Sequence, residues 1–209
     1  KTKAILLVHM YGGINNSELF KKIAKRNRLF IVEDCAESLG GKDENGNLVG
    51  SMGDIACWSF QGAKHLTCGD GGIVSTSSKK LAEKIRKYSN LGFKFLTADA
   101  DKILTSKENL QNPKSERFEL IGYNYRMNEF SAAVALAQFE RVSYFLNLRR
   151  KMALKFLKII KKSKILKPQK ISKKTYSTFY TLSAKLIDKK IKWDRFRKKF
   201  IECRGDPIY

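Results

Sequence analysis

A single lysine lies in a glycine-rich loop that follows an apolar segment, and an aspartate closes another apolar segment thirty residues earlier. The lysine is Lys64, within the run WSFQGAKHLTCGDGG (residues 58–72), and the aspartate is Asp34. A lysine amine can form a Schiff base with an aldehyde, and a carboxylate can keep a pyridine nitrogen protonated. The pair therefore predicts pyridoxal 5'-phosphate as the cofactor, with both side chains projecting from strand ends of one sheet.

The segments around these residues predict the sheet that would position them. Residues 4–8 (AILLV) form a continuous apolar run, which is typical of a strand covered on both faces. Asn16 or Ser17 can cap a helix that follows, and residues 29–33 predict a second strand. Such a β–α–β unit places functional residues at the carboxyl ends of parallel strands. Residues 55–60 and 73–76 predict two further strands that flank the Lys64 loop.

The second half of the chain predicts mainly helices. Ser78 can cap a helix over 79–90, whereas residues 94–118 lose all periodicity and predict a long loop over the site. Asn128 begins a strong helical pattern that continues to about residue 163. A strand around 176–182 and a helix over 193–203 complete the prediction.

The charge of the chain is unevenly distributed. The 209 residues carry a net charge of +22, and residues 1–140 hold 20 lysines and arginines against 16 acidic residues. Residues 141–209 hold 22 against four. This basic segment is rich in lysine rather than arginine and contains no nucleic-acid motif, so a solvated helical face is expected rather than a nucleic-acid surface.

The cysteines and the hydropathy pattern predict a cytoplasmic protein. The four cysteines show no CxxC spacing, so neither a metal site nor a disulfide framework is expected. The sequence contains no signal peptide and no uncharged run of about 18 apolar residues. We therefore expect no membrane partner.

Six motifs in order resemble the DegT/DnrJ/EryC1/StrS family of nucleotide-sugar aminotransferases. They are residues 8–12 (VHMYG), 32–38 (VEDCAES), 49–54 (VGSMGD), 59–64 (SFQGAK), 69–72 (GDGG) and 122–127 (GYNYRM). Six ordered motifs are far more specific than any one of them. The resemblance is dense over residues 4–150 and loose over 151–209.

The resemblance implies a role for five residues. Lys64 would form the Schiff base with pyridoxal phosphate and shuttle a proton, and Asp34 would pair with the ring nitrogen. Glu37 would lie near the ring hydroxyl, on one helical face with Asp34 if the chain were helical there. Ser59 would donate to the phosphate. Asn124 would reach the phosphate of a neighbouring subunit, which implies a homodimer with shared active sites.

Other readings of these residues stay open. Asp34 could instead hold a turn, Glu37 could face solvent, and Ser59 or Asn124 could be structural. His9 and Arg126 match family positions, and a structural role is expected for both. Asp70 replaces the family's usual glutamate and conserves its charge.

The resemblance also implies the fold and the domains. We expect an α/β protein of PLP-dependent transferase fold type I, which is aspartate aminotransferase-like. The chain would contain part of the mixed, mostly parallel seven-stranded sheet of the large domain. Residues 1–140 would form this cofactor-binding domain without its N-terminal part, and residues 141–209 a linking helix and an incomplete small domain. The chain thus looks like an internal fragment.

The expected activity is transfer of an amino group, from glutamate, to a keto sugar linked to a nucleotide. Three alternatives remain: an inactive truncated fragment, a PLP-dependent sugar dehydratase, and a basic nucleic-acid-binding protein. The dehydratases of this fold carry a histidine where Lys64 stands, so His65, one residue on, keeps that alternative open.

Overall fold

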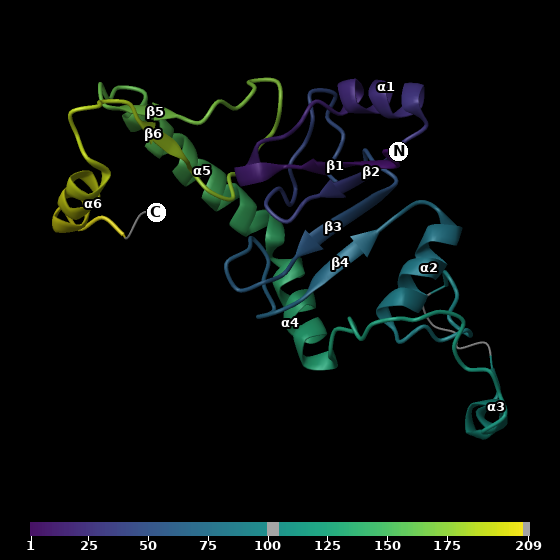
Figure 1. Ribbon diagram of the computed structural model, residues 1–209. Helices are drawn as coiled ribbons and strands as arrows, with labels where there is room; N and C mark the ends of the chain where they lie inside the picture. Colours follow the sequence, from purple (N-terminus) through teal and green to yellow (C-terminus); the bar gives the residue numbers. More distant parts are fainter. Residues whose placement is uncertain (100–104, 207–209) are drawn as a thin grey trace.

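A mixed four-stranded sheet forms the centre of the computed structural model, which describes residues 1–99 and 105–206 (Figure 1). Its strands are β1 (Ala4–Val8), β2 (Phe30–Asp34), β3 (Ile55–Ser59) and β4 (Gly72–Ser75), and they lie in this order across the sheet. The first three are parallel, and β4 runs antiparallel to β3. The strands predicted from the apolar runs are confirmed to within one or two residues.

Helix α1 (Ser17–Asn27) forms the connection between the parallel strands β1 and β2. The Asn16 side chain caps it by accepting a hydrogen bond from the backbone N–H of Leu19 at 3.0 Å. Leu7, Ala24 and Ile31 form the buried core between this helix and the sheet. A second buried cluster lies under the loop that precedes β3 and contains Cys35, Val49, Met52 and Ala56.

The turn over residues 43–47 is organised by one buried carboxylate. Asp43 accepts hydrogen bonds from the Ser17 hydroxyl at 2.6 Å and from the backbone N–H groups of Asn45 and Asn47 at 2.9 Å each. Burial alone would raise its pKa, but the hydrogen bonds outweigh burial and lower the pKa of Asp43 to about 2. The turn is thereby fastened to the first residue of α1.

Replacing Asp43 by asparagine should destabilise the fold by about 2 kcal/mol at pH 7, because the ionised form is the one that the site binds. A depressed pKa stabilises the fold above the unfolded value, 3.8, and this contribution disappears as the pH falls toward 2. Urea unfolding should therefore show a gap between the two proteins that shrinks to about half by pH 3. Glu44→Gln, at the exposed neighbour, is the control. An equal gap at pH 7 and pH 3 would contradict the assignment.

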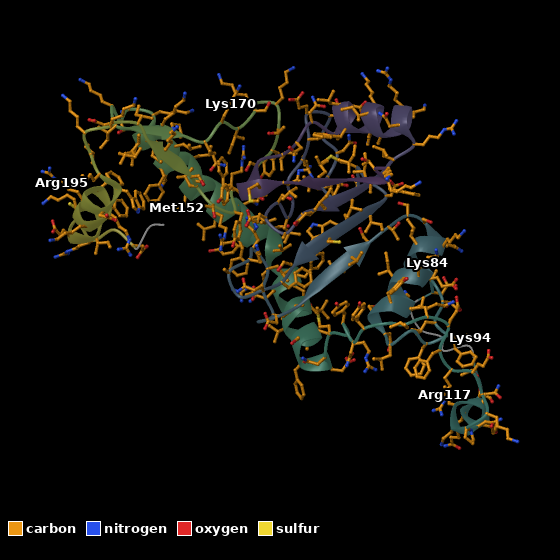
Figure 2. All side chains as sticks on the ribbon, in the orientation of Figure 1. Lys84, Lys94, Arg117, Met152, Lys170 and Arg195 are labelled. Atoms are coloured by element: carbon orange, nitrogen blue, oxygen red, sulfur yellow. The ribbon has the colours of Figure 1, made fainter. Side chains whose placement is uncertain are left out.

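Helix α2 (Lys79–Ser89) begins at Ser78, whose side chain accepts from the N–H of Leu81, as predicted. The segment predicted as a long loop contains a short helix, α3 (Lys107–Gln111). Phe93 pairs with Phe118, and Figures 1 and 2 place this region beside α2, away from the loop that joins β3 and β4. The expectation that this loop covers the site is therefore wrong for its described part, and residues 100–104 lie outside the described residues.

The long helix predicted from Asn128 to about residue 163 is two helices, α4 (Glu129–Glu140) and α5 (Val142–Ile160). They meet at Arg141, whose φ of −106° and ψ of 1° are not helical. Asn128 caps α4 by accepting from the N–H of Ser131 at 2.8 Å. No residue of α4 is buried, although the helix is apolar around most of its circumference.

The C-terminal part contains a two-stranded antiparallel sheet, β5 (Leu166–Pro168) with β6 (Ala184–Leu186), and helix α6 (Trp193–Glu202). The strand predicted around 176–182 is wrong. Phe179 has a φ of +53°, which is incompatible with an extended strand, and the only β contact of this stretch within the described residues is a bridge from Tyr176 to Lys42.

The basic segment forms solvated surfaces. Lys151, Lys155 and Lys158 are exposed along α5. Arg195 lies at the opposite end of the molecule from Lys94 and Arg117, and Lys170 lies between them at the top of the view (Figure 2). Across the described ranges, no helix combines the length and the apolar character needed to cross a bilayer.

Candidate cofactor site

The carboxyl ends of the three parallel strands lie side by side and carry most of the predicted site residues. Val8 is in register with Asp34, and Asp34 is in register with Cys57, two residues before Ser59. The Lys64 loop leaves β3 at this edge. It is closed at its base by two backbone hydrogen bonds, Phe60 N–H to Gly71 O at 2.8 Å and Cys68 N–H to Phe60 O at 3.0 Å.

Lys64 extends from this loop to Glu37, which follows β2. Its Nζ lies 3.5 Å from Glu37 Oε1, and the two side chains are only 16% and 20% exposed. The other carboxylate oxygen of Glu37 accepts from the N–H of Tyr11 at 2.7 Å. The structure thus brings Lys64 and Glu37 together, and it rules out the solvent-facing alternative for Glu37.

Asp34 is half-buried at the last position of β2. Its Oδ1 accepts from the N–H of Ala36 at 3.0 Å, so the chain turns immediately after the strand. Asp34 and Glu37 would share a face only if the chain were helical there, and because a turn follows Asp34 this condition is not met. Burial raises the pKa of the Cys57 thiol opposite, and the negative charge of Asp34 adds to this rise.

Ser59 ends β3, and its Oγ accepts from the N–H of Gln61 at 3.3 Å. The hydroxyl hydrogen has no acceptor among the described residues, so it is free to donate. Asn124 is exposed and lies apart from this group. It accepts from Arg126 Nε at 2.8 Å and forms a backbone bridge with Asn90.

His9 has the structural role expected of it. It is fully buried, and its Nε2 lies 3.2 Å from Glu33, which is also fully buried. Since His9 Nδ1 accepts from the N–H of Asn15 at 3.3 Å, its Nε2 carries the proton and donates to Glu33. Glu33 also accepts from the N–H groups of Gly50, Met52 and Gly53 at 2.6–2.9 Å.

His9, Glu33 and Cys35 have potential metal-ligating atoms within 4.8 Å of one another. The Glu33 oxygens are already engaged by these donors, and the His9 Nε2 proton is used. Burial raises the pKa of the Cys35 thiol, and the charges of Glu33 and Asp34 raise it further, so the thiol stays protonated. A hydrogen-bonded structural cluster fits these residues better than a metal site.

His65 is buried next to Tyr180 and Thr178. Its ring centroid lies 5.7 Å from that of Tyr180, and its Nε2 lies 3.4 Å from the carbonyl oxygen of Thr178. Burial lowers the pKa of His65 to about 4, and the positive charge of Arg149 contributes. His65 is therefore a neutral side chain packed against Tyr180, whereas Lys64 presents its amine to Glu37.

An open groove of about 1140 Å³ lies beside β4 and α2, where Trp58, Asp70, Tyr88 and Arg126 are among the lining residues. Lys64 does not line it. We assign the candidate site to Lys64 rather than to this groove because the Lys64 amine contacts Glu37, and Asp34 and Ser59 lie at the ends of the neighbouring strands β2 and β3.

Comparisons with known proteins agree with this fold. One solved structure, an Escherichia coli GDP-4-keto-6-deoxy-D-mannose-3-dehydratase with bound hydrated PLP, superposes with a TM-score of 0.82 at 24% identity, over 98% of this chain and 52% of that one. A variant of GDP-4-keto-6-deoxymannose-3-dehydratase with bound GDP-perosamine superposes with a TM-score of 0.78 at 26% identity, over 96% of this chain and 50% of that one. A DegT DnrJ EryC1 StrS aminotransferase from Brucella abortus also superposes, with a TM-score of 0.76 at 26% identity over 97% of this chain and 48% of that one, so the α/β fold is that of the PLP-dependent aminotransferase structures.

The sequence places the chain within this class. The profile of the DegT/DnrJ/EryC1/StrS aminotransferase family matches residues 1–204, and the chain belongs to that family. A GDP-perosamine synthase from Escherichia coli O157:H7 is 35% identical over 183 residues, which are 88% of this chain and 45% of that protein. The chain spans about half the length of the curated relatives it matches.

The residues present fit pyridoxal phosphate, the cofactor bound in one of these structures. Lys64 Nζ is largely covered, yet it makes no hydrogen bond within the described residues, and its single carboxylate lies at 3.5 Å. Charge-assisted N–H···O bonds are normally 2.7–2.9 Å long. A shielded amine with unused bonding capacity beside Glu37, together with the Asp34 carboxylate and the free Ser59 hydroxyl at the ends of β2 and β3, suits a group with an aldehyde, a basic ring nitrogen and a phosphate.

Proposed function

We propose that this protein is a PLP-dependent aminotransferase that transfers an amino group from glutamate to a keto sugar linked to a nucleotide, for amino-sugar or polysaccharide biosynthesis. Glutamate would become 2-oxoglutarate, and the keto carbon would become the carbon that bears the amine. The observation that carries the proposal is the shielded Lys64 amine beside Glu37, at the strand ends. Family membership and similarity to a GDP-perosamine synthase support it.

Four residues of this chain would hold the cofactor. The Lys64 amine would bind its aldehyde carbon, Asp34 would orient the ring through its nitrogen, Glu37 would lie at the ring hydroxyl, and Ser59 would donate to the phosphate. When bound, pyridoxal phosphate supplies an electron sink for the substrate carbon that loses its proton. Once released, Lys64 Nζ would accept that proton from the substrate carbon and would then donate it to the second reacting carbon. Glu37 would keep Nζ in place through its ionic contact.

The position of His65 argues against a dehydratase. In that alternative a histidine would replace the lysine as the group that meets the cofactor. Here the His65 ring is buried against Tyr180, and Lys64 is the side chain that reaches Glu37. These two positions therefore favour an aminotransferase over a dehydratase.

The test is to titrate the purified chain with pyridoxal phosphate, record the visible absorption band, reduce with borohydride and map the labelled peptide. A band and one label on Lys64 are expected, after which glutamate should discharge the band and nucleotide-linked keto sugars should restore it. Scattered labelling of the exposed lysines of residues 141–206, without a band, would contradict the proposal for a chain of this length.

We also propose that the active unit is a homodimer with shared sites. Helix α4 and the segment before it expose large apolar side chains, among them Ile121 at 89%, Tyr125 at 72%, Phe130 at 87% and Leu136 at 63%. A helix that is apolar on all sides is normally buried. A second copy that covers α4 would bring the exposed Asn124 close to the neighbouring site.

Sedimentation equilibrium should therefore give twice the chain mass of 23.9 kDa, and Phe130→Glu should shift the equilibrium to the monomer. A charge buried in an interface without a partner is strongly unfavourable. Phe156→Glu, at a residue of α5 that is 50% exposed, is the matched control and should leave the dimer intact. A monomeric parent protein, or the same effect from both variants, would argue against this interface.

We further propose that residues 1–140 form the cofactor-binding domain and that residues 141–209 link to and begin a smaller domain. The helix break at Arg141 coincides with this boundary and supports the division.

A further inference from the structure

A segment from the C-terminal part of the chain, residues 176–180 (YSTFY), lies against the candidate site. Tyr176 pairs with Lys42 through two backbone hydrogen bonds of 2.9 Å. Ser177 and Thr178 are fully buried. The segment approaches the backbone at Gly12 so closely that a Cβ there would lie 3.1 Å from both Ser177 Oγ and the Tyr180 nitrogen. It therefore forms a fixed wall of the site.

Tyr180 brings its ring to the reactive amine. Lys64 Nζ lies 4.5 Å from the centroid of this ring, and 3.5 Å from Glu37 Oε1. An ammonium over an aromatic face is attracted by the ring quadrupole, and more strongly when it is shielded from water. The amine is thus held between a carboxylate and a ring, and its side chain is only 16% exposed.

Two arginines of α5 hold this wall in place. Arg150 donates to the carbonyl oxygen of Ser177 at 2.5 Å, and its guanidinium stacks 4.1 Å from the centroid of the Tyr176 ring. Arg149 donates to the carbonyl oxygen of Tyr180 at 3.4 Å. The left-handed φ of +53° at Phe179 lets the chain turn between these anchors, so Tyr180 is presented by a braced segment rather than by a free loop.

We propose that Tyr180 is a positioning residue for Lys64: its ring confines the amine against Glu37 and limits the access of water and of small reagents. The proposed function is needed only to explain what the confinement is for. The contact itself belongs to the cofactor-free chain and can be measured there. Because Nζ lies over the ring face, the ring should be required and the hydroxyl group should not.

The test is competitive acylation with trace acetic anhydride in the absence of cofactor, read by peptide mass spectrometry. The rate at Lys64 is referred to exposed Lys173. Tyr180→Leu should raise the relative Lys64 rate at least about threefold, since it removes the ring. Tyr180→Phe should leave the rate unchanged, and Tyr144→Leu, at an exposed tyrosine of α5, is the matched control.

Lys87, which is 5% exposed and paired with Glu83 and Glu119, reports folding in the same spectra. Tyr180→Met, with a flexible chain in place of the ring, is measured in parallel. The result is taken from whichever of Tyr180→Leu and Tyr180→Met keeps Lys87 protected from acylation and is therefore folded. An unchanged Lys64 rate in that protein, or a rise in Tyr180→Phe equal to that in Tyr180→Leu, would overturn the proposal. If pyridoxal phosphate fails to bind the parent chain, only the proposed function fails, and the acylation result still stands.

Discussion

Lys64→Ala should abolish covalent attachment of pyridoxal phosphate, with loss of both the visible band and the borohydride-stable label. The reason is chemical, because alanine removes the amine that lies shielded beside Glu37. Lys64→Arg should give the same loss while keeping the positive charge, because a guanidinium is always protonated and does not form the Schiff base. Absorbance and peptide mapping after reduction measure both variants.

Lys42→Ala serves as the control, because Lys42 is exposed and only its backbone is bonded to Tyr176. It should keep the band and the label of the parent chain. An undiminished label on other lysines in Lys64→Ala would show that attachment is nonspecific and would remove the main support for the proposed site.

Glu33→Ala is expected to destabilise the fold by about 3–5 kcal/mol. Glu33 is fully buried and accepts from His9 and from the N–H groups of Gly50, Met52 and Gly53. Alanine would leave a cavity and four hydrogen-bond donors, buried or partly buried, without an acceptor. The loss should extend to the candidate site, since Glu33 immediately precedes Asp34. Urea unfolding at pH 7 measures it.

The control for Glu33→Ala is Glu140→Ala, on the exposed surface of α4, which should change the free energy of unfolding by no more than about 0.5 kcal/mol.

The cost of Glu33→Ala should depend on pH. Burial of Glu33 raises its pKa, but the four hydrogen bonds outweigh burial and the net pKa is lowered. Its contribution is therefore complete above about pH 4.5 and declines as the pH falls below that value. A cost at pH 7 as small as that of Glu140→Ala would contradict this role.

The central sheet could be predicted because its signals are local. The apolar run of residues 4–8 is a strand at those same residues, and Asn16 and Ser78 cap helices as their side chains suggest. The break at Arg141 could not be predicted, since no glycine or proline marks it and both flanking segments favour a helix. Helix α3 could not be predicted either, because it is short and its periodicity is weak.

The site was partly predictable. The motifs identified Lys64 and Glu37, and the structure places them in contact. The chain turns after Asp34, because the Asp34 carboxylate accepts a hydrogen bond from the N–H of Ala36, so Asp34 and Glu37 do not lie on a helix. Tyr180 was missed, since its place depends on Arg149 and on the turn at Phe179, and no local pattern encodes such distant contacts.

The wall formed by residues 176–180 also sets when the site can be assembled during synthesis. The hydrogen-bond partners His65 and Thr178 are separated by 113 residues. At elongation rates of about 5–20 residues per second, this segment is completed roughly 6–23 s after the Lys64 loop. Throughout that interval the Lys64 side chain lacks the Tyr180 ring, so the amine becomes shielded only after residues 176–180 have been synthesised.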